Sequence, residues 1–306
     1  MRAAMIGAAA ALLLAGGTSV LAQGGPDYSQ IEIKTTKVGG SLFVLEGIGG
    51  NMGGNISVLA GPDGAFMVDA AFAPLSAKIL AAVKAVQPDG RIRFLVNTHL
   101  HGDHTGGNEN MARAGATLLS RESLRRRLAT PGPTASGQPG TPAPAAALAV
   151  LTYDAPVTVH VNGDDVQLIP VPNAHTDGDT MIYFPSVHAL AVGDFYRSTG
   201  YPNIDRSNGG TMDGMLAGFE AIARVGGPDL TIIPGHGPLV GKAQVAAHRA
   251  MMMAVRDKVA ALIEAGKTQE EVVAAKPTAE FDAKVPGATP QSADRFVAQV
   301  YQELKK

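Results

Sequence analysis

The 306-residue chain contains no cysteine and no tryptophan. Disulfide cross-links, thiolate ligands and cysteine nucleophiles are therefore excluded, and stability must come from an apolar core and from any metal that binds. Aromatic residues make up only 5% of the chain and charged residues only 17%, with a net charge of −2. This balance, without a basic stripe, predicts no nucleic-acid partner. The one dense basic run, Arg125 to Arg127, is expected on a helix, as a solvated face or a loop anchor.

Long apolar runs are also scarce, and the one candidate lies at the start of the chain. Arg2 precedes an apolar run from Met5 to Gly16, and Val20-Leu21-Ala22 provides a small-residue exit. This pattern predicts a secretory signal peptide over residues 1–22, cut after Ala22, with residues 23–306 as one exported domain, periplasmic or secreted. The alternative, a membrane anchor, would need about 20 apolar residues, and no later run reaches that length either. We therefore expect no membrane partner.

Hydrophobic periodicity divides the rest of the chain into two strand-rich halves, each followed by helices. Strands are predicted over residues 31–38, 42–45, 55–60, 65–68, 91–97, 157–161, 166–171, 180–184, 189–192 and 230–233. Helices are predicted over residues 74–86, 212–225, 243–265 and 293–304, with another beginning near Thr268. Residues 130–145, rich in proline, glycine, serine and threonine, are expected to form a loop. The pattern indicates an α+β fold of two packed sheets with helices outside.

Residues 98–104 read Thr-His-Leu-His-Gly-Asp-His and directly follow a predicted strand. Four metal-capable side chains stand within six residues: His99, His101, Asp103 and His104. Imidazoles and carboxylates at this density are typical of sites for zinc or a similar ion. The first two histidines point the same way on an extended segment, and a bend at Gly102 would turn the other two ligands towards a second position. The competing interpretation, a polar surface loop, needs three of the eight histidines to fall together by chance.

Four further candidate residues follow predicted strands, where loops carry chemistry. They are Asp69, His175, Asp194 and His236. Taken singly, a histidine or aspartate at the end of a strand is more often a turn or capping residue. Taken with residues 98–104, the four instead complete an ordered set of metal-binding residue types.

The ordered set resembles the five sequence motifs of the metallo-β-lactamase superfamily, spread from Asp69 to His236. The resemblance implies an αββα sandwich: two mixed sheets packed face to face, helices outside, and a site along one edge of the sheets. It implies two metals, with Asp194 bridging them or completing the second site, and with Asp69 orienting the metal loop by hydrogen bonds. The ligands of the first metal would be His99, His101 and His175, and those of the second would be Asp103, His104 and His236.

One position departs from the common lactamase subclass, which carries cysteine where Asp194 stands. A carboxylate there is the pattern of glyoxalase II-like and other hydrolases of the superfamily. Lactamases with that cysteine often carry a substrate-binding lysine three residues later, and Arg197 holds the corresponding place. Its planar guanidinium suits a carboxylate, with a plain surface arginine as the alternative. Asn203 is the candidate donor to a substrate carbonyl, and Asn208 is its alternative.

The glycine-rich stretch from Gly49 to Asn55 does not open a helix, as a phosphate-binding loop would. We expect a flexible hairpin over the site, with Met52 offering an apolar contact to substrate; a simple glycine-rich turn is the alternative. The remaining histidines are expected to be structural or at the surface. They are His160, His188 and His248.

These residues predict a hydrolase that binds two zinc ions, with iron or manganese as alternative metals. The two ions would share a water and lower its pKa, and the resulting hydroxide would attack a carbonyl carbon while Asp103 binds metal and orients it. A β-lactam is the first-ranked small-molecule substrate; a lactone, a thioester as in glyoxalase II, or a phosphodiester is the alternative. A non-catalytic binding module would be expected to have lost ligands, and a mononuclear iron oxygenase would use fewer of them.

Overall fold

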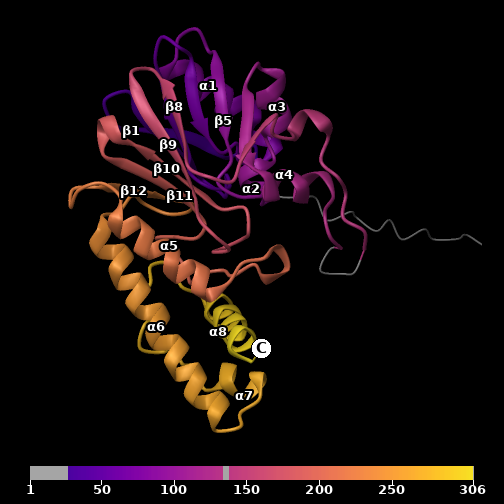
Figure 1. Cartoon of the computed structure of the whole chain (residues 1–306), viewed down its shortest axis with the longest axis vertical. Coiled ribbons are helices and arrows are strands. Elements are labelled where there is room, and N and C mark those ends of the chain that lie inside the picture. Colours follow the sequence, from indigo (N-terminus) through magenta and orange to yellow (C-terminus); the bar gives the residue numbers. More distant parts are fainter. Residues whose placement is uncertain (1–26, 134–137, 306) are drawn as a thin grey trace, which may run out of the picture.

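The structure is a computed structural model, which describes residues 27–133 and 138–305. The predicted signal peptide, residues 1–22, lies outside the described residues. Two mixed β-sheets form the centre of the molecule, and helices cover the outer side of each sheet (Figure 1). This layering confirms the predicted αββα sandwich. None of the described helices is both long enough and apolar enough to cross a membrane.

The first sheet contains seven strands in chain order, and the second contains five in the order β12-β11-β10-β9-β8. The strands of the first sheet are β1 (Glu32–Gly39), β2 (Leu42–Ile48), β3 (Ile56–Leu59), β4 (Ala65–Val68), β5 (Ile92–Val96), β6 (Thr117–Arg121) and β7 (Leu151–Tyr153). Those of the second are β8 (Val157–Val161), β9 (Asp164–Pro170), β10 (Thr180–Phe184), β11 (Ala189–Gly193) and β12 (Thr231–Pro234). Strands β4 to β7 run parallel to one another, as do β11 and β12, and all other neighbours are antiparallel.

The central strands are buried on both faces, which explains why their sequences are continuous apolar runs. In β4, Phe66 and Val68 belong to the core between the two sheets. Ala65 and Met67 point the other way and pack in the core beneath the outer helices. The alternation follows the two-residue period of a strand, so one short strand joins two hydrophobic cores.

Two groups of helices cover the sheets. On the first sheet, α1 (Ser76–Val86) and α3 (Asn108–Arg113) share one apolar core with the strands. On the second sheet, α5 (Met212–Arg224), α6 (Lys242–Glu264) and α8 (Pro290–Leu304) share another. The shorter helices are α2 (Gly102–Thr105), α4 (Glu122–Ala129) and α7 (Gln269–Ala274), with 3-10 turns at Ala73–Leu75, Ala145–Ala147, Pro185–Val187 and Arg206–Asn208.

Every strand and helix predicted from the sequence has a counterpart in the structure, with ends that move by a few residues at most. Thr268 caps α7 through a hydrogen bond from the Glu271 backbone N–H, as its capping-box pattern predicts. Within residues 130–145, the described parts before Ala145 contain no helix or strand. The strands β6 and β7 and the short helices α2 and α3 were missed. β7 has only three residues, none of them buried, so it carries no apolar alternation to detect.

The direction of the strands gathers the candidate residues at one edge of the sandwich. Asp69 follows β4 and the segment 98–104 follows β5, while Asp194 and His236 follow β11 and β12. Because the strands within each pair are parallel, their carboxyl ends lie at the same edge. The loop between β9 and β10 brings His175 to the same place.

Candidate metal centre

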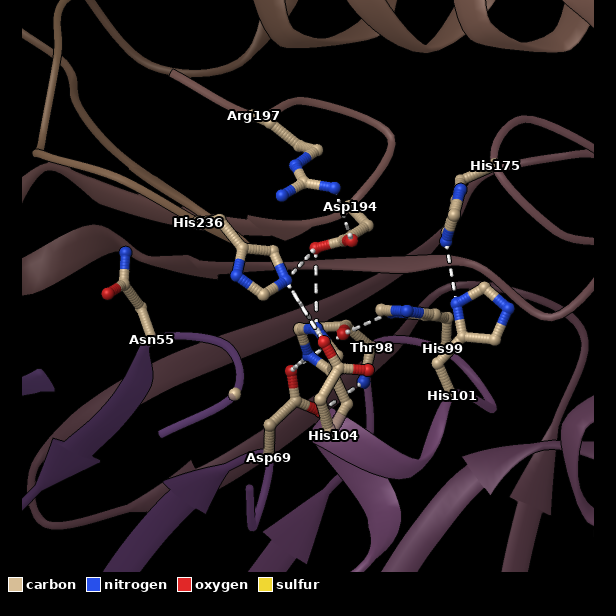
Figure 2. Close-up of polar contacts among 12 residues, drawn as sticks. Asn55, Asp69, Thr98, His99, His101, His104, His175, Asp194, Arg197 and His236 are labelled. Atoms are coloured by element: carbon tan, nitrogen blue, oxygen red, sulfur yellow. Dashed lines mark hydrogen bonds and ion pairs between the residues drawn. The ribbon is translucent and has the colours of Figure 1, made fainter. Parts of the chain in front are cut away.

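Seven side chains that the sequence predicts to bind metal lie together at this edge (Figure 2). They form three overlapping groups, and within each group the ligand atoms lie within 4.8 Å of one another. The groups are His99, His101 and His175; His99, His104 and Asp194; and Asp103, His104 and His236. The first and third groups match the two sets expected from the sequence, and the middle group links them.

In the three-histidine group, hydrogen bonds decide which nitrogen the imidazoles of His101 and His175 turn inwards. His101 Nε2 lies 2.7 Å from Asp205 Oδ2, and His175 Nδ1 lies 2.7 Å from the backbone carbonyl oxygen of Asn203. A neutral imidazole has one N–H, so these nitrogens donate and the other nitrogen of each ring carries a lone pair. The lone-pair nitrogens, His101 Nδ1 and His175 Nε2, face each other at 2.9 Å. Two lone pairs this close repel each other unless a cation lies against both.

In the group of Asp103, His104 and His236, the donor atoms are spaced like the corners of a tetrahedral metal site. His236 Nε2 lies 3.2 Å from both Asp103 Oδ2 and Asp194 Oδ1. His104 Nε2 lies 3.3 Å from Asp194 Oδ1, 3.4 Å from His236 Nε2 and 3.8 Å from Asp103 Oδ2. Zinc–nitrogen bonds of about 2.0–2.1 Å place tetrahedral ligands about 3.3–3.4 Å apart. The spacing of these four atoms therefore fits such an ion.

Two buried atoms of the cluster have no hydrogen-bonding partner among the described residues. They are His99 Nε2 and Asp194 Oδ1, and both residues belong to the group that links the two sets. Native proteins seldom leave buried polar atoms unpaired, because the lost hydration is costly. Together with the facing lone pairs, these atoms show that the residues fit bound metal ions.

Three ligands of the cluster, His99, His175 and Asp194, are in the protonation states that suit metal binding. Burial lowers the pKa of His99 well below its usual value and that of His175 to about 4, so both rings are neutral at pH 7. Burial also acts to raise the pKa of Asp194, but His236 and His104 outweigh it and hold that pKa well below its usual value. Neutral imidazoles and ionised carboxylates are the forms that bind zinc. Burial acts to lower the pKa of His104 and of His236, but nearby carboxylates, Asp69 and Asp194 for His104 and Asp194 for His236, raise both, so a bound cation would displace those protons.

Asp69 holds the metal loop in place by three hydrogen bonds. Its Oδ1 accepts from Thr98 N at 2.8 Å, and its Oδ2 accepts from Thr98 Oγ1 and from His104 Nδ1, both at 2.7 Å. The backbone of Asp69 is left-handed, with φ 64°, which is uncommon outside glycine and costs energy. These contacts are those expected of a residue that orients the metal loop, and the strained backbone marks the site.

Glycines allow the backbone to approach the ligands. A Cβ on Gly54 would collide with the imidazole of His104, and a Cβ on Gly235 would collide with Asp194 Oδ1. Gly54 N also donates to Asp103 O at 3.1 Å. The glycine-rich hairpin is therefore attached to the metal loop.

The predicted contact between Met52 and substrate was wrong. The Met52 side chain is only 2% exposed and belongs to the core with Ile31 and Leu45. An apolar residue inside a polar, glycine-rich stretch is buried because it anchors that stretch to the core, which its sequence position alone does not reveal.

Arg197 lies next to Asp194, with 4.0 Å between Arg197 Nη1 and Asp194 Oδ2 (Figure 2). Its side chain is 26% exposed, and its Nε is buried without a hydrogen-bonding partner among the described residues. The guanidinium therefore lies beside the cluster, and some of its N–H donors are available to a ligand.

The two candidate asparagines lie in the loop behind the three-histidine group. The side-chain oxygen of Asn203 accepts from Gln299 Nε2 at 2.9 Å, in addition to the contact of its backbone carbonyl with His175. Asn208 Nδ2 donates to Asp205 Oδ2 at 2.6 Å. A substrate-binding role for Asn203 remains a prediction.

Asp205 is a residue of the centre that the sequence did not reveal. It lies 30 positions beyond His175 in a polar loop, and only the fold brings it to His101.

Arg127, in the basic run, contacts two loops near the centre. Its Nη2 lies 2.6 Å from Asp177 Oδ2, and its Nη1 donates to Asn208 Oδ1 at 3.1 Å. The basic run thus includes a loop anchor, one of its two predicted interpretations.

The other three histidines lie outside the ligand groups. His160 pairs with Asp165 on the surface at 2.7 Å. His188 is exposed and occupies a left-handed turn position. The ring of His248 packs against Tyr196 and Phe219.

Comparisons with known proteins agree with this geometry. A family model described as the metallo-beta-lactamase superfamily matches residues 49–241. No curated protein matches the sequence. Among solved structures, the sec-alkylsulfatase Pisa1 from Pseudomonas sp. is similar over 88% of this chain, with 16% identity and a TM-score of 0.63. The match covers 50% of that protein, so this chain spans about half its length.

Two lactamase structures are similar over most of their own length. A metallo-beta-lactamase from Pontibacter korlensis has 16% identity and a TM-score of 0.57, covering 72% of this chain and 99% of its own. The DIM-1 metallo-beta-lactamase has 19% identity and a TM-score of 0.57, covering 73% and 98%. At these sequence identities the structural matches show a shared fold alone. The family match spans more than half of the sequence, and the chain therefore belongs to the metallo-beta-lactamase superfamily of metal-dependent hydrolases.

Proposed function

We propose that the chain is an exported hydrolase that binds two zinc ions and opens a β-lactam ring. The observation that carries the proposal is the presence of two complete, adjacent sets of donor atoms. A binding module that had abandoned catalysis would be free to lose these ligands, and all seven are in place. Zinc is favoured over iron or manganese because the donors are mainly imidazoles at tetrahedral spacing.

In this proposal, one ion would be held by the nitrogens of His99, His101 and His175, and the other by Asp103, His104 and His236, with Asp194 between them. Bound zinc would supply an acidic water and a Lewis acid for the carbonyl oxygen. Burial acts to raise the pKa of Asp103, but a hydrogen bond from His236 and the charge of His104 lower it to about 2. Asp103 therefore stays ionised at neutral pH, and its carboxylate can orient the attacking water.

A substrate would approach from the side of the partly exposed ligands. The side chains of His101, Asp103 and His236 are 27%, 24% and 15% exposed, whereas those of His104 and Asp194 are 0% and 6% exposed. Arg197 lies on the Asp194 side of the cluster and would bind the carboxylate of a β-lactam. The scissile bond would then lie over the exposed ligands.

A sulfate ester is the second candidate substrate. The likeness to the sec-alkylsulfatase covers 88% of this chain, more than its first 241 residues could provide, so it extends into the C-terminal helices. The likeness to the lactamases covers 72% and 73%. Asp194 in place of cysteine also leaves room for other esters, which include a lactone, a thioester and a phosphodiester.

The purified chain, loaded with zinc and analysed for metal content, should be assayed with five substrates. These are a chromogenic cephalosporin, a lactone, a thioester, a phosphodiester and a secondary alkyl sulfate. The proposal expects turnover of the cephalosporin, and faster turnover of the alkyl sulfate would favour the second candidate. Failure to hydrolyse any of the five with two zinc ions bound would reject the proposed function.

Replacing His101 by alanine tests the assignment of the first metal. His101→Ala removes one of three nitrogen donors, so bound zinc should fall by about one ion per chain, with activity lost alongside it. Metal analysis after gel filtration measures the ratio. His160→Ala is the matched control, because His160 lies on the surface outside the ligand groups and should leave two ions bound. Equal zinc content in the two variants would contradict the assignment.

Replacing Arg197 tests substrate binding. Loss of a charge-assisted hydrogen bond costs about 1.5–3 kcal/mol, so Arg197→Ala should raise KM for carboxylate-bearing substrates roughly tenfold or more. The zinc content should stay at the wild-type value, and Arg197→Lys should recover part of the affinity because it keeps the charge. An unchanged KM in the alanine variant would reject this role.

Export is the part of the proposal that rests on the sequence alone. The pattern in residues 1–22 predicts that the mature chain begins at Gln23. Expression of the full sequence in a Gram-negative host, followed by intact-mass measurement of the periplasmic fraction, should find this processed chain. A full-length chain that stays in the cytoplasm would contradict export.

A further inference from the structure

The C-terminal helix α8 contacts a loop that adjoins the metal centre. This loop, residues 203–208, follows β11 and contains the partners of two histidines of the first group. The helix begins at Pro290, far beyond the residues 49–241 that match the family model. Its apolar residues pack in the same core as those of α5 and α6, so its polar contacts to the loop start from a fixed support.

Gln299 of α8 forms two hydrogen bonds to the part of the loop that orients His175. Its Oε1 accepts from Ile204 N at 3.0 Å, and its Nε2 donates to Asn203 Oδ1 at 2.9 Å. Between these two contacts lies the carbonyl of Asn203, which accepts from His175 Nδ1 at 2.7 Å. Gln299 thus holds the side chain of Asn203 and the N–H of Ile204, which lie on either side of the Asn203 carbonyl. These two hydrogen bonds fix the direction in which that carbonyl points.

Glu303 and Gln302 hold the part of the loop that orients His101. Arg206 Nε donates to Glu303 Oε1 at 2.7 Å, and Arg206 Nη1 donates to Gln302 Oε1 at 3.0 Å. The Glu303 side chain is only 6% exposed and that of Arg206 is 37% exposed, so this charge-assisted pair is shielded on the Glu303 side. The preceding residue is Asp205, whose Oδ2 lies 2.7 Å from His101 Nε2.

The loop is fixed from its other side as well. Asp205 N donates to His175 O at 3.0 Å, and Asn208 N donates to Asp205 O at 3.1 Å. On the far side, Arg127 of α4 reaches Asn208 Oδ1 at 3.1 Å. The loop therefore lies between two helices. Helix α8 contacts Asn203, Ile204 and Arg206, while α4 contacts Asn208, whose Nδ2 donates to Asp205 Oδ2 at 2.6 Å.

We propose that α8 positions the three-histidine metal site: Gln299 sets the carbonyl that orients His175, and Glu303, through Arg206, holds the backbone that carries the carboxylate orienting His101. Partners of the outer nitrogen fix the tautomer and direction of a ligating imidazole, and their loss commonly weakens metal binding about 10- to 100-fold. These residues are positioning residues, since none of them reaches the ligand atoms. The inference rests on the metal assignment in the proposed function and extends it to a helix outside the family match.

The test compares the affinity for each of the two zinc ions. Gln299→Met keeps the length of the side chain but removes both hydrogen bonds, and Glu303→Gln keeps the shape but removes the charge. Gln291→Met is the matched control, because Gln291 is exposed in the first turn of the same helix. Stepwise zinc affinity is measured by competition with a chromophoric chelator, at a temperature where circular dichroism shows all variants folded. Visible spectra of the Co²⁺-substituted proteins report the geometry at the metal.

We expect one of the two ions to bind more weakly, by up to about 10-fold, in Gln299→Met and in Glu303→Gln, with the other ion unaffected; this is the lower end of the range for loss of a ligand's own partner. The Co²⁺ spectrum should change in both variants, and the control should match the wild type. A merely structural role for α8 would lower the thermal midpoint and leave zinc affinity and the Co²⁺ spectrum unchanged, which would overturn the proposal. A wild-type chain that binds no zinc would overturn the metal assignment and this inference together, whereas unchanged variants of a two-zinc wild type would overturn this inference alone.

Discussion

The hydrogen bonds made by the outer nitrogens of three ligand imidazoles are the interactions on which the centre depends. His104 donates to Asp69, His101 to Asp205 and His175 to the carbonyl of Asn203. Each bond fixes which nitrogen of the ring faces outwards and so turns the other nitrogen towards the cluster. Without these partners the rings could rotate or change tautomer, and the buried cluster would lose the shape that fits a cation.

The rest of the fold serves to bring these partners to the rings. Two pairs of parallel strands end at one edge, which places the ligand loops side by side. Strands buried on both faces hold that edge rigidly, because each one packs in two cores. Glycines then let the hairpin at Gly54 and the turn at Gly235 come close to the ligands. Asp69 adopts a left-handed backbone conformation, which is energetically unfavourable, in order to reach the metal loop. Its three hydrogen bonds stabilise that conformation.

The features that depend on neighbouring residues in the sequence could be predicted from it. Residues 98–104 contain four ligands in one segment, and a buried strand pattern before them indicates where they lie. The remaining ligands could be placed because each follows a predicted strand, and strand ends meet at a sheet edge. The expectation of two packed sheets with helices outside followed from the same apolar periodicity, and the resemblance to the superfamily implied the αββα sandwich. Strand β7 was missed because none of its residues is buried.

What the sequence could not reveal depends on contacts between distant segments. Gln299 is an ordinary polar residue of an amphipathic helix, and only packing of α8 brings it to Asn203. Asp205 follows its partner His101 by more than a hundred residues, so no spacing rule connects them. The prediction for Met52 was wrong for a related reason. Its glycine-rich neighbours predict an exposed hairpin, but the fold buries Met52 in the core that includes Ile31 and Leu45.

The central claim is that two cations fit this cluster, and anomalous diffraction from a zinc-loaded crystal tests it most directly. Data collected on both sides of the zinc absorption edge locate the metal without reference to activity. The account predicts two anomalous peaks, one among His99, His101 and His175 and one among Asp103, His104 and His236. A single peak, or peaks away from these residues, would contradict it.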